Sequence, residues 1–308
     1  MSVTTRSSLI SWNVAVPVLA MVALAFAWNR ELGAVPVVAV AIVLAGAVLA
    51  AVHHAEVVAL RVGEPFGSLV LAIAVTVIEV ALIVTLMVSG GPDTASLARD
   101  TVFAAVMITC NGIVGLSLLL GAMRYGVTVF NAEGSGAALA TVATLATLSL
   151  VLPTFTTSEL GPAFSPAQLV FAAVTSLALY GMFVLTQTVR HRDFFLPVTS
   201  PRTLAEAEAA EHVTPPTTRA TMGSLALLLI ALVAVVGLAK VESPAIEAGV
   251  ASAGFPQSFV GVVIALLVLL PETLAAVRAA RRDRVQISLN LAFGSAMASI
   301  GLTIPAIA

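Results

Sequence analysis

The sequence is poor in the residues on which several functional classes depend. It has a single cysteine, Cys110, which excludes an internal disulfide and a cysteine-rich metal site. Only 10% of the residues are charged, the formal net charge is −2, and no basic cluster is interleaved with aromatic residues. We therefore expect no nucleic-acid partner.

Aspartate and histidine are missing from the apolar runs. All four aspartates fall in connecting segments, which excludes an intramembrane aspartyl protease, because that class needs two aspartates within the membrane. The four histidines fall at boundaries or in loops, which disfavours a transition-metal carrier. We interpret the adjacent His53 and His54 as solvated interface residues, with a pH-sensing or metal-binding pair as the alternative. The stretch that holds them, residues 53–65, is predicted as an interfacial helix.

Apolar residues are abundant instead. They make up 59% of the 308 residues, and the mean hydropathy is +1.08. This composition predicts an all-α polytopic membrane protein, with the bilayer as its main partner. The first apolar run is too long for a removed leader and predicts a retained helix. Segments of bilayer length occur at nine places, residues 12–28, 34–52, 66–88, 101–121, 135–153, 166–188, 221–239, 258–277 and 286–308.

Two glutamates lie within these apolar runs. Glu79 has about eleven residues before it and nine after it in the run 68–88, so its side chain cannot reach either interface. Glu272 follows Pro271 in the run 258–277, and proline disturbs the helix around it. A charged side chain at such a depth costs a few kcal/mol and marks a functional site by default. The two glutamates predict an ion- or proton-handling site.

The basic residues predict the orientation. With the N-terminus inside, the inner loops hold eleven arginines, whereas the outer loops hold only Arg30, Arg99 and Lys240. This bias predicts a cytoplasmic N-terminus. The third and eighth segments then run in opposite directions, and each is followed by a helix with small and polar residues, among them Asn111 and Ser295. Antiparallel helix pairs of this kind are typical of inverted-repeat transporters.

The longest polar segment, residues 190–220, divides the two halves. Its acidic residues predict a short solvated helix, and a cation-attracting or regulatory surface is the alternative. They are Glu206, Glu208 and Glu211.

Three stretches carry a resemblance to a known family. They are RVGEPFGSLVLAIAVTVIEVALI, RDTVFAAVMITCNGIVGLSLLLG and LLPETLAAVRAARRDRVQISLNLAFGSAMASIGLTIPA. They resemble the ChaA-type branch of the calcium/cation–proton antiporters, within the cation/calcium exchanger superfamily. The resemblance implies two repeats that share one cation site, and export of a cation in exchange for protons. Glu79 and Glu272 match the acidic residues of the repeats, and Asn111 and the Gly294-Ser295 pair match the polar positions that follow.

The sequence departs from this family in two ways. Calcium-selective relatives close a Gly-Asn-Ala-Ala-Glu motif, whereas Thr76 and Leu269 stand at the asparagine positions here. Sodium or potassium are therefore expected as cargo beside or instead of calcium. The family also has eleven spans, so the last two helices are expected to be missing. The expected organisation is an extra N-terminal helix (1–30), a first half with Glu79 (31–189), a cytoplasmic acidic loop (190–220) and an incomplete second half with Glu272 (221–308).

The chemistry of the residues supports antiport independently. Ca²⁺ takes six to eight oxygen ligands, and two glutamates supply at most four of them. Hydroxyls such as those of Thr76 and Ser295, the Asn111 amide, backbone carbonyls and water complete the expected shell. Burial and mutual repulsion favour the protonated carboxyl, so an empty site should take up protons.

We therefore expect a non-enzymatic inner-membrane transporter without a cofactor that works by alternating access. A cation channel and a truncated, inactive or regulatory relative are the alternatives. The shared site predicts that the carboxyl carbons of Glu79 and Glu272 approach within about 12 Å, which allows both to reach one Ca²⁺ after modest closure. The incomplete second half predicts lower stability in detergent or a homodimer that covers its apolar face.

Overall fold

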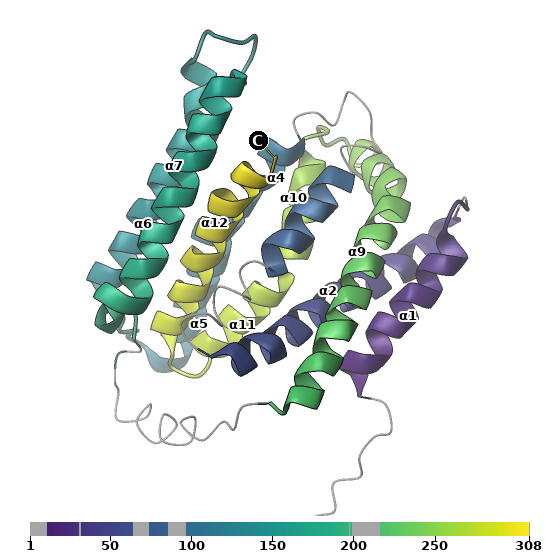
Figure 1. Ribbon diagram of the computed structural model, residues 1–308, viewed down its shortest axis with the longest axis horizontal. Coiled ribbons are helices and arrows are strands. Elements are labelled where there is room, and N and C mark those ends of the chain that lie inside the picture. The colour runs from purple at the N-terminus through teal and green to yellow at the C-terminus, as the bar shows by residue number, and fades with distance from the viewer. Residues whose placement is uncertain are drawn as a thin grey trace, which may run out of the picture. The chain divides into compact units, whose positions relative to one another are not determined.

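The computed structural model describes residues 11–30, 32–63, 74–85, 97–196, 198 and 216–307 (Figure 1). Within these ranges every regular element is a helix, so the predicted all-α fold is confirmed. Helices suit these apolar runs because a helix satisfies its backbone hydrogen bonds internally, which a bilayer requires. Residues 199–215 lie outside the described ranges, and the predicted helix with Glu206, Glu208 and Glu211 stays a prediction.

The predicted count of nine spanning helices is not confirmed. Among the described residues, six helical stretches are long and apolar enough to span a bilayer: Ala34–Val62, Leu97–Tyr125, Ala132–Phe155, Pro166–Arg190, Thr218–Ser252 and Val285–Ala306. A bent helix pair, Phe259–Val268 and Leu270–Ala280, makes a seventh if it is one span. The predicted segments 12–28 and 66–88 appear as shorter helices, Trp12–Ala27 and Ala74–Thr85, and residues on both sides of the second lie outside the described ranges.

The chain divides into two compact units. The first unit holds residues 1–91 and 215–254, and the second holds residues 92–214 and 255–308. Each unit therefore takes elements from both predicted halves of the sequence. The halves were inferred from sequence symmetry, and that division stays a prediction.

The first unit consists of α1 (Trp12–Ala27), α2 (Ala34–Val62), the helix Ala74–Thr85 and α9 (Thr218–Ser252). Helices α2 and α9 are antiparallel, because Arg61 near the end of α2 reaches the start of α9. Its Nη1 donates to the Pro216 carbonyl oxygen at 3.3 Å, and its Nη2 donates to Thr218 Oγ1 at 3.1 Å. Both helices contain fully buried alanines, and such small side chains let packed backbones approach closely.

The predictions for residues 53–65 are wrong in two respects. Helix α2 continues to Val62 and ends at Gly63, whose φ of +77° suits a glycine C-cap, so the polar stretch extends a spanning helix. His54 is not solvated: it is 2% exposed. Its Nε2 lies 2.9 Å from the backbone oxygen of Asn13, and the Asn13 side chain lies 2.9 Å from His53 Nε2. The histidines tie α1 to α2, because α1 supplies the partners that water was expected to supply.

The second unit is arranged around α12 (Val285–Ile307). Helix α12 packs against α11 (Leu270–Ala280), α7 (Pro166–Leu185), α6 (Ala132–Ala146) and α5 (Val114–Tyr125) (Figure 1). Its buried residues lie on several sides of the helix and include Leu289, Ala292, Ala296 and Ile300. A helix that is buried on several sides is suited to the centre of a bundle.

Polar side chains at the start of α12 hold it to its neighbours. Gln286 Oε1 accepts a hydrogen bond from the backbone nitrogen of Asn131 at 2.6 Å, and Asn290 Nδ2 donates to the Phe195 carbonyl oxygen at 2.6 Å. Ser288 Oγ, which is fully buried, lies 2.6 Å from Ser117 Oγ on α5 and 2.9 Å from the Ala276 carbonyl oxygen on α11. These hydrogen bonds give Gln286, Ser288 and Asn290 a role in packing.

Candidate functional site

Glu79 lies in the middle of the helix Ala74–Thr85 in the first unit. It is 2% exposed, and its neighbours Ile78, Leu82 and Ile83 are buried as well. Thr76 is buried three residues earlier, and residues three apart share one face of a helix. The predicted carboxylate and the predicted hydroxyl are thus placed side by side in an apolar environment.

Glu272 lies beside a break in the helix of the second unit. Helix α10 (Phe259–Val268) and α11 are bent by 56° at Leu269, which confirms the predicted disturbance at Pro271. Pro271 fits the first turn of α11, where a missing N–H costs nothing. Glu272 follows in the same turn, where the partial positive charge of a helix N-terminus stabilises a carboxylate. The Oε2 atom of Glu272 is shielded from solvent.

Close packing fixes the position of this break. A buried apolar cluster joins α10 and α11 to α4 (Leu97–Met107), to η2 (Ile108–Ile113) and to α12. Its members are Ala104, Ala105, Ile113, Ala265, Leu269, Ala276 and Ala292. Leu269, one of the two residues at the asparagine positions of the family motif, is 1% exposed within this cluster and offers no oxygen from its side chain.

The helix that carries Asn111 contains a π-helical turn, Ile108–Ile113. Asn111 is exposed, and its Nδ2 donates to the Met107 carbonyl oxygen at 3.1 Å. Thr109 is fully buried, and its Oγ1 has no hydrogen-bond partner among the described residues. Such turns are frequent at functional sites. Thr109 is a ligand candidate that sequence reasoning did not select, because the altered helical register has no signal in the sequence.

The predicted site residues divide between the two units. Glu272, Asn111 and Ser295 belong to the second unit, where α11, η2 and α12 contact one another, and Ser295 is half-buried. Glu79 and Thr76 belong to the first unit. The expectation that both carboxylates serve one site stays a prediction. In the part of the chain that the structure describes, no group of three or more His, Cys, Asp or Glu side chains could hold a metal ion.

A third carboxylate is buried in a spanning helix, which sequence reasoning missed. Glu242 is 2% exposed in α9. The predicted segment ended at residue 239, but the helix continues through Pro244 to Ser252. Hydropathy alone could not find this continuation, because the added residues are partly polar.

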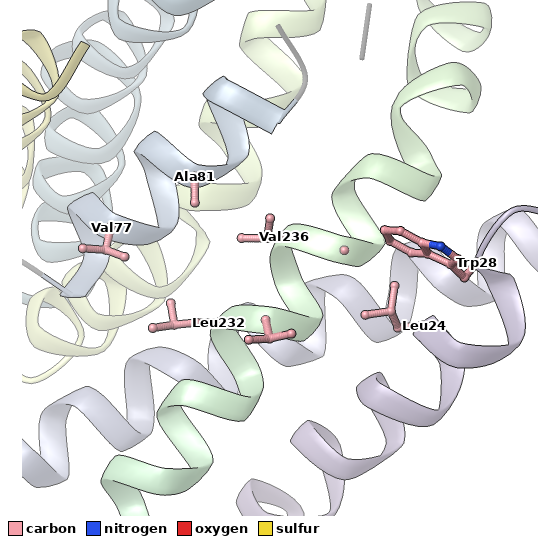
Figure 2. Close-up of a pocket in the computed structure, with 8 residues that line it drawn as sticks. Leu24, Trp28, Val77, Ala81, Leu232 and Val236 are labelled. Atoms are coloured by element: carbon pink, nitrogen blue, oxygen red, sulfur yellow. The ribbon is translucent and has the colours of Figure 1, made fainter. Parts of the chain in front are cut away.

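The first unit also contains an apolar cavity of about 450 Å³ (Figure 2). Val77 and Ala81, on the helix of Glu79, lie on one side of it, and Leu232 and Val236 of α9 lie opposite. Its remaining lining residues are Leu24, Trp28, Val233 and Gly237. An apolar lining gives an ion no ligands, so the cavity is not itself the ion site.

Comparison with known proteins places this geometry in context. The profile of a family described as "Sodium/calcium exchanger protein" matches residues 32–189 and 223–308. The "Putative ionic transporter y4hA" of Sinorhizobium fredii is 49% identical over 265 residues, which cover 86% of this chain and 70% of that protein. The "Sodium-potassium/proton antiporter ChaA" of Escherichia coli is 36% identical over 296 residues, which cover 94% of this chain and 78% of that protein.

Two solved structures have the same fold. The H⁺/Ca²⁺ exchanger CAX superposes with a TM-score of 0.69 at 16% identity, covering 96% of this chain and 71% of its own. Native YfkE superposes with a TM-score of 0.63 at 16% identity, covering 96% and 79%. At these identities the likeness concerns the fold alone.

Proposed function

Because the chain belongs to the sodium/calcium exchanger family, a family of multi-pass membrane cation exchangers, we propose that it exports a cation in exchange for protons by alternating access. The burial of Glu79 in the middle of an apolar helix carries this proposal. A role in exchange would account for a carboxylate at that depth despite its cost. Glu272, in the first turn after a helix break, supplies the second carboxylate.

The donor set favours monovalent cargo. Calcium-selective relatives have an amide at each of two positions, and these hold Thr76 and the buried Leu269 here. The site therefore has one hydroxyl in place of one amide and no side-chain oxygen in place of the other. Since Ca²⁺ needs six to eight oxygens, we propose that Na⁺ or K⁺ is carried and that Ca²⁺ competes. The similarity to the Escherichia coli protein named a sodium-potassium/proton antiporter supports this preference for monovalent cations.

Cation and protons alternate at the carboxylates in this proposal. Carboxylates in an apolar setting are costly to keep charged, so the empty site takes up protons. A cation from the cytoplasm displaces them and is released outside, where protons return. The excess of arginines in the predicted inner loops supports an N-terminus in the cytoplasm and a place in the plasma membrane.

Cation-dependent proton flux in everted membrane vesicles tests the proposal. Glu79→Gln and Glu272→Gln each remove a titratable oxygen but little volume, and each should abolish exchange while the protein remains in the membrane. Glu159→Gln is the matched control, because Glu159 is exposed in a connecting segment. Flux at the wild-type level in either site variant would remove that residue from the mechanism. Flux that does not saturate and does not respond to a pH gradient would instead support a channel.

A further inference from the structure

Glu242 is a buried carboxyl that the exchange site described above does not use. Its Oε1 atom has no hydrogen-bond partner within the described ranges. Lys240, two residues earlier, does not neutralise it, since its ammonium lies over the Trp28 ring at 5.1 Å from the centroid. The ion pair of Arg99 with Asp100, at 3.6 Å, lies in the other unit. A charged carboxylate is costly in such a setting, and a protonated one much less so.

A few polar groups lie near Glu242 in the sequence of α9. Ser243 is buried beside it, but the Ser243 hydroxyl donates to Glu247 Oε1 at 2.9 Å. Pro244 has no N–H, so the carbonyl of Lys240 lacks its usual helical donor. Glu242 itself lies on the same face of α9 as the buried Val235 and Leu238.

Glu242 lies closer to the C-terminal end of α9 than the stretch of α9 that faces the helix of Glu79. The cavity of Figure 2 places Val77 and Ala81, which flank Glu79 in sequence, opposite α9 between Leu232 and Gly237. Glu242 follows Gly237 by five residues, which is about 7.5 Å along a helix axis. It lies farther from Thr218, and therefore nearer the outer end of α9 in the orientation proposed above.

Other titratable groups of the first unit are distant or point elsewhere. Helix α1 has none, and Glu79 is the one on the helix Ala74–Thr85. The titratable groups of α2 all lie in its last ten residues. This part of α2 is at the opposite end of α9 from Glu242, because Arg61 meets the start of α9. These groups are His53, His54, Glu56 and Arg61. Arg30, after α1, is exposed.

We propose that Glu242 is a proton-binding residue on the path between the outer solution and Glu79. The carboxylate takes a proton from water on the outer side, and the O–H bond formed in this step is broken when the proton moves on toward Glu79. Burial favours the neutral form while the proton is held, and Glu79 is the carboxyl farther inward along the direction of α9. This inference rests on the proposed exchange function.

Two measurements on Glu242→Gln test the inference, with Glu247→Gln as the matched control on the same helix. Infrared spectra of the purified protein, taken across pH and in heavy water, should contain a protonated-carboxyl band that Glu242→Gln lacks and Glu247→Gln retains. In vesicles, Glu242→Gln should lower the maximal exchange rate about tenfold or more, since positioned proton-transfer groups contribute ~10²-fold or more, and leave the half-saturating inner cation concentration unchanged.

The outcomes separate the inference from the function on which it rests. The inference would be overturned if Glu242→Gln exchanged at the wild-type rate with the wild-type pH dependence. It would also be overturned if Glu242→Gln kept the protonated-carboxyl band. If the wild-type protein shows no exchange, the proposed function fails, and the infrared band alone decides whether Glu242 holds a proton. Should Glu242→Gln fail to fold, Glu242→Asp keeps a carboxyl. Glu242→Asp should then shift the infrared band and retain exchange. A band that does not shift would show that it does not come from Glu242.

Discussion

The contact of α10 with α4 at Gly261 should be intolerant of a single added methyl group. A Cβ atom at Gly261 would lie 2.8 Å from the backbone nitrogen of Thr101 and 2.9 Å from the carbonyl carbon of Asp100. Carbon atoms pack best at about 3.5–4.0 Å, so the helices must separate by roughly 0.7 Å. The obstacle is backbone, which no side-chain rotation can remove.

The expected loss for Gly261→Ala follows from two opposing effects. Overpacking costs about 1–3 kcal/mol, whereas alanine gains about 1 kcal/mol over glycine inside a helix. With rigid backbone at the contact, the net loss in stability should be about 1–2 kcal/mol. Gly223→Ala is the matched control, because nothing lies within 4 Å of its Cβ position in α9 and only the gain remains.

Thermal unfolding in detergent measures both variants. Gly261→Ala should lower the midpoint by several degrees, since each kcal/mol corresponds to roughly 2–4 °C in proteins of moderate size. Gly223→Ala should leave the midpoint unchanged or raise it. Exchange activity should fall in Gly261→Ala, because α10 carries the break before Glu272. A midpoint at or above the wild-type value in Gly261→Ala would show that the two helices separate at no cost and would refute the reasoning.

Two further substitutions address the second unit. Ser288→Ala should lower the free energy of unfolding by about 1–3 kcal/mol, because it removes the hydrogen-bond partner of the Ser117 hydroxyl and of the Ala276 carbonyl. An unchanged thermal midpoint would show that these two hydrogen bonds do not contribute to stability. Thr109→Val should weaken cation binding in a flux titration and leave the thermal midpoint near that of the wild type, with Thr109→Ser retaining affinity. Equal affinity in all three proteins would restrict Thr109 to packing.

The sequence identified the carboxylates well because their signal is local. A charge deep in an apolar run, as at Glu79, and a proline before a carboxylate, as at Pro271, are visible without any knowledge of neighbours. The burial of Glu79 and the bend at Leu269 agree with those signals. The roles of these residues in transport stay predictions.

The features that sequence reasoning missed depend on partners distant in the chain. His54 is buried because Asn13, about forty residues away, supplies its hydrogen bond. Glu242 is buried because α9 continues past the apolar run while packed against other helices. The π-helical turn at Thr109 changes the register without any special residue. Periodicity and composition describe one helix at a time and do not register such partners.

Two polar contacts of α9, one at its start and one at Lys240, have a consequence for the lipid. Thr218, bound by Arg61, and Lys240, over Trp28, are 22 residues apart, which is about 33 Å of helix. This length is close to the ~30 Å hydrocarbon thickness of a bilayer, and basic and tryptophan side chains favour its interfaces. A thinner bilayer would make α9 tilt to keep both contacts at the interfaces. Because Glu242 lies just beyond Lys240 on the same rigid helix, its depth would change with acyl-chain length, and the thickness of the membrane would set how readily water reaches that carboxyl.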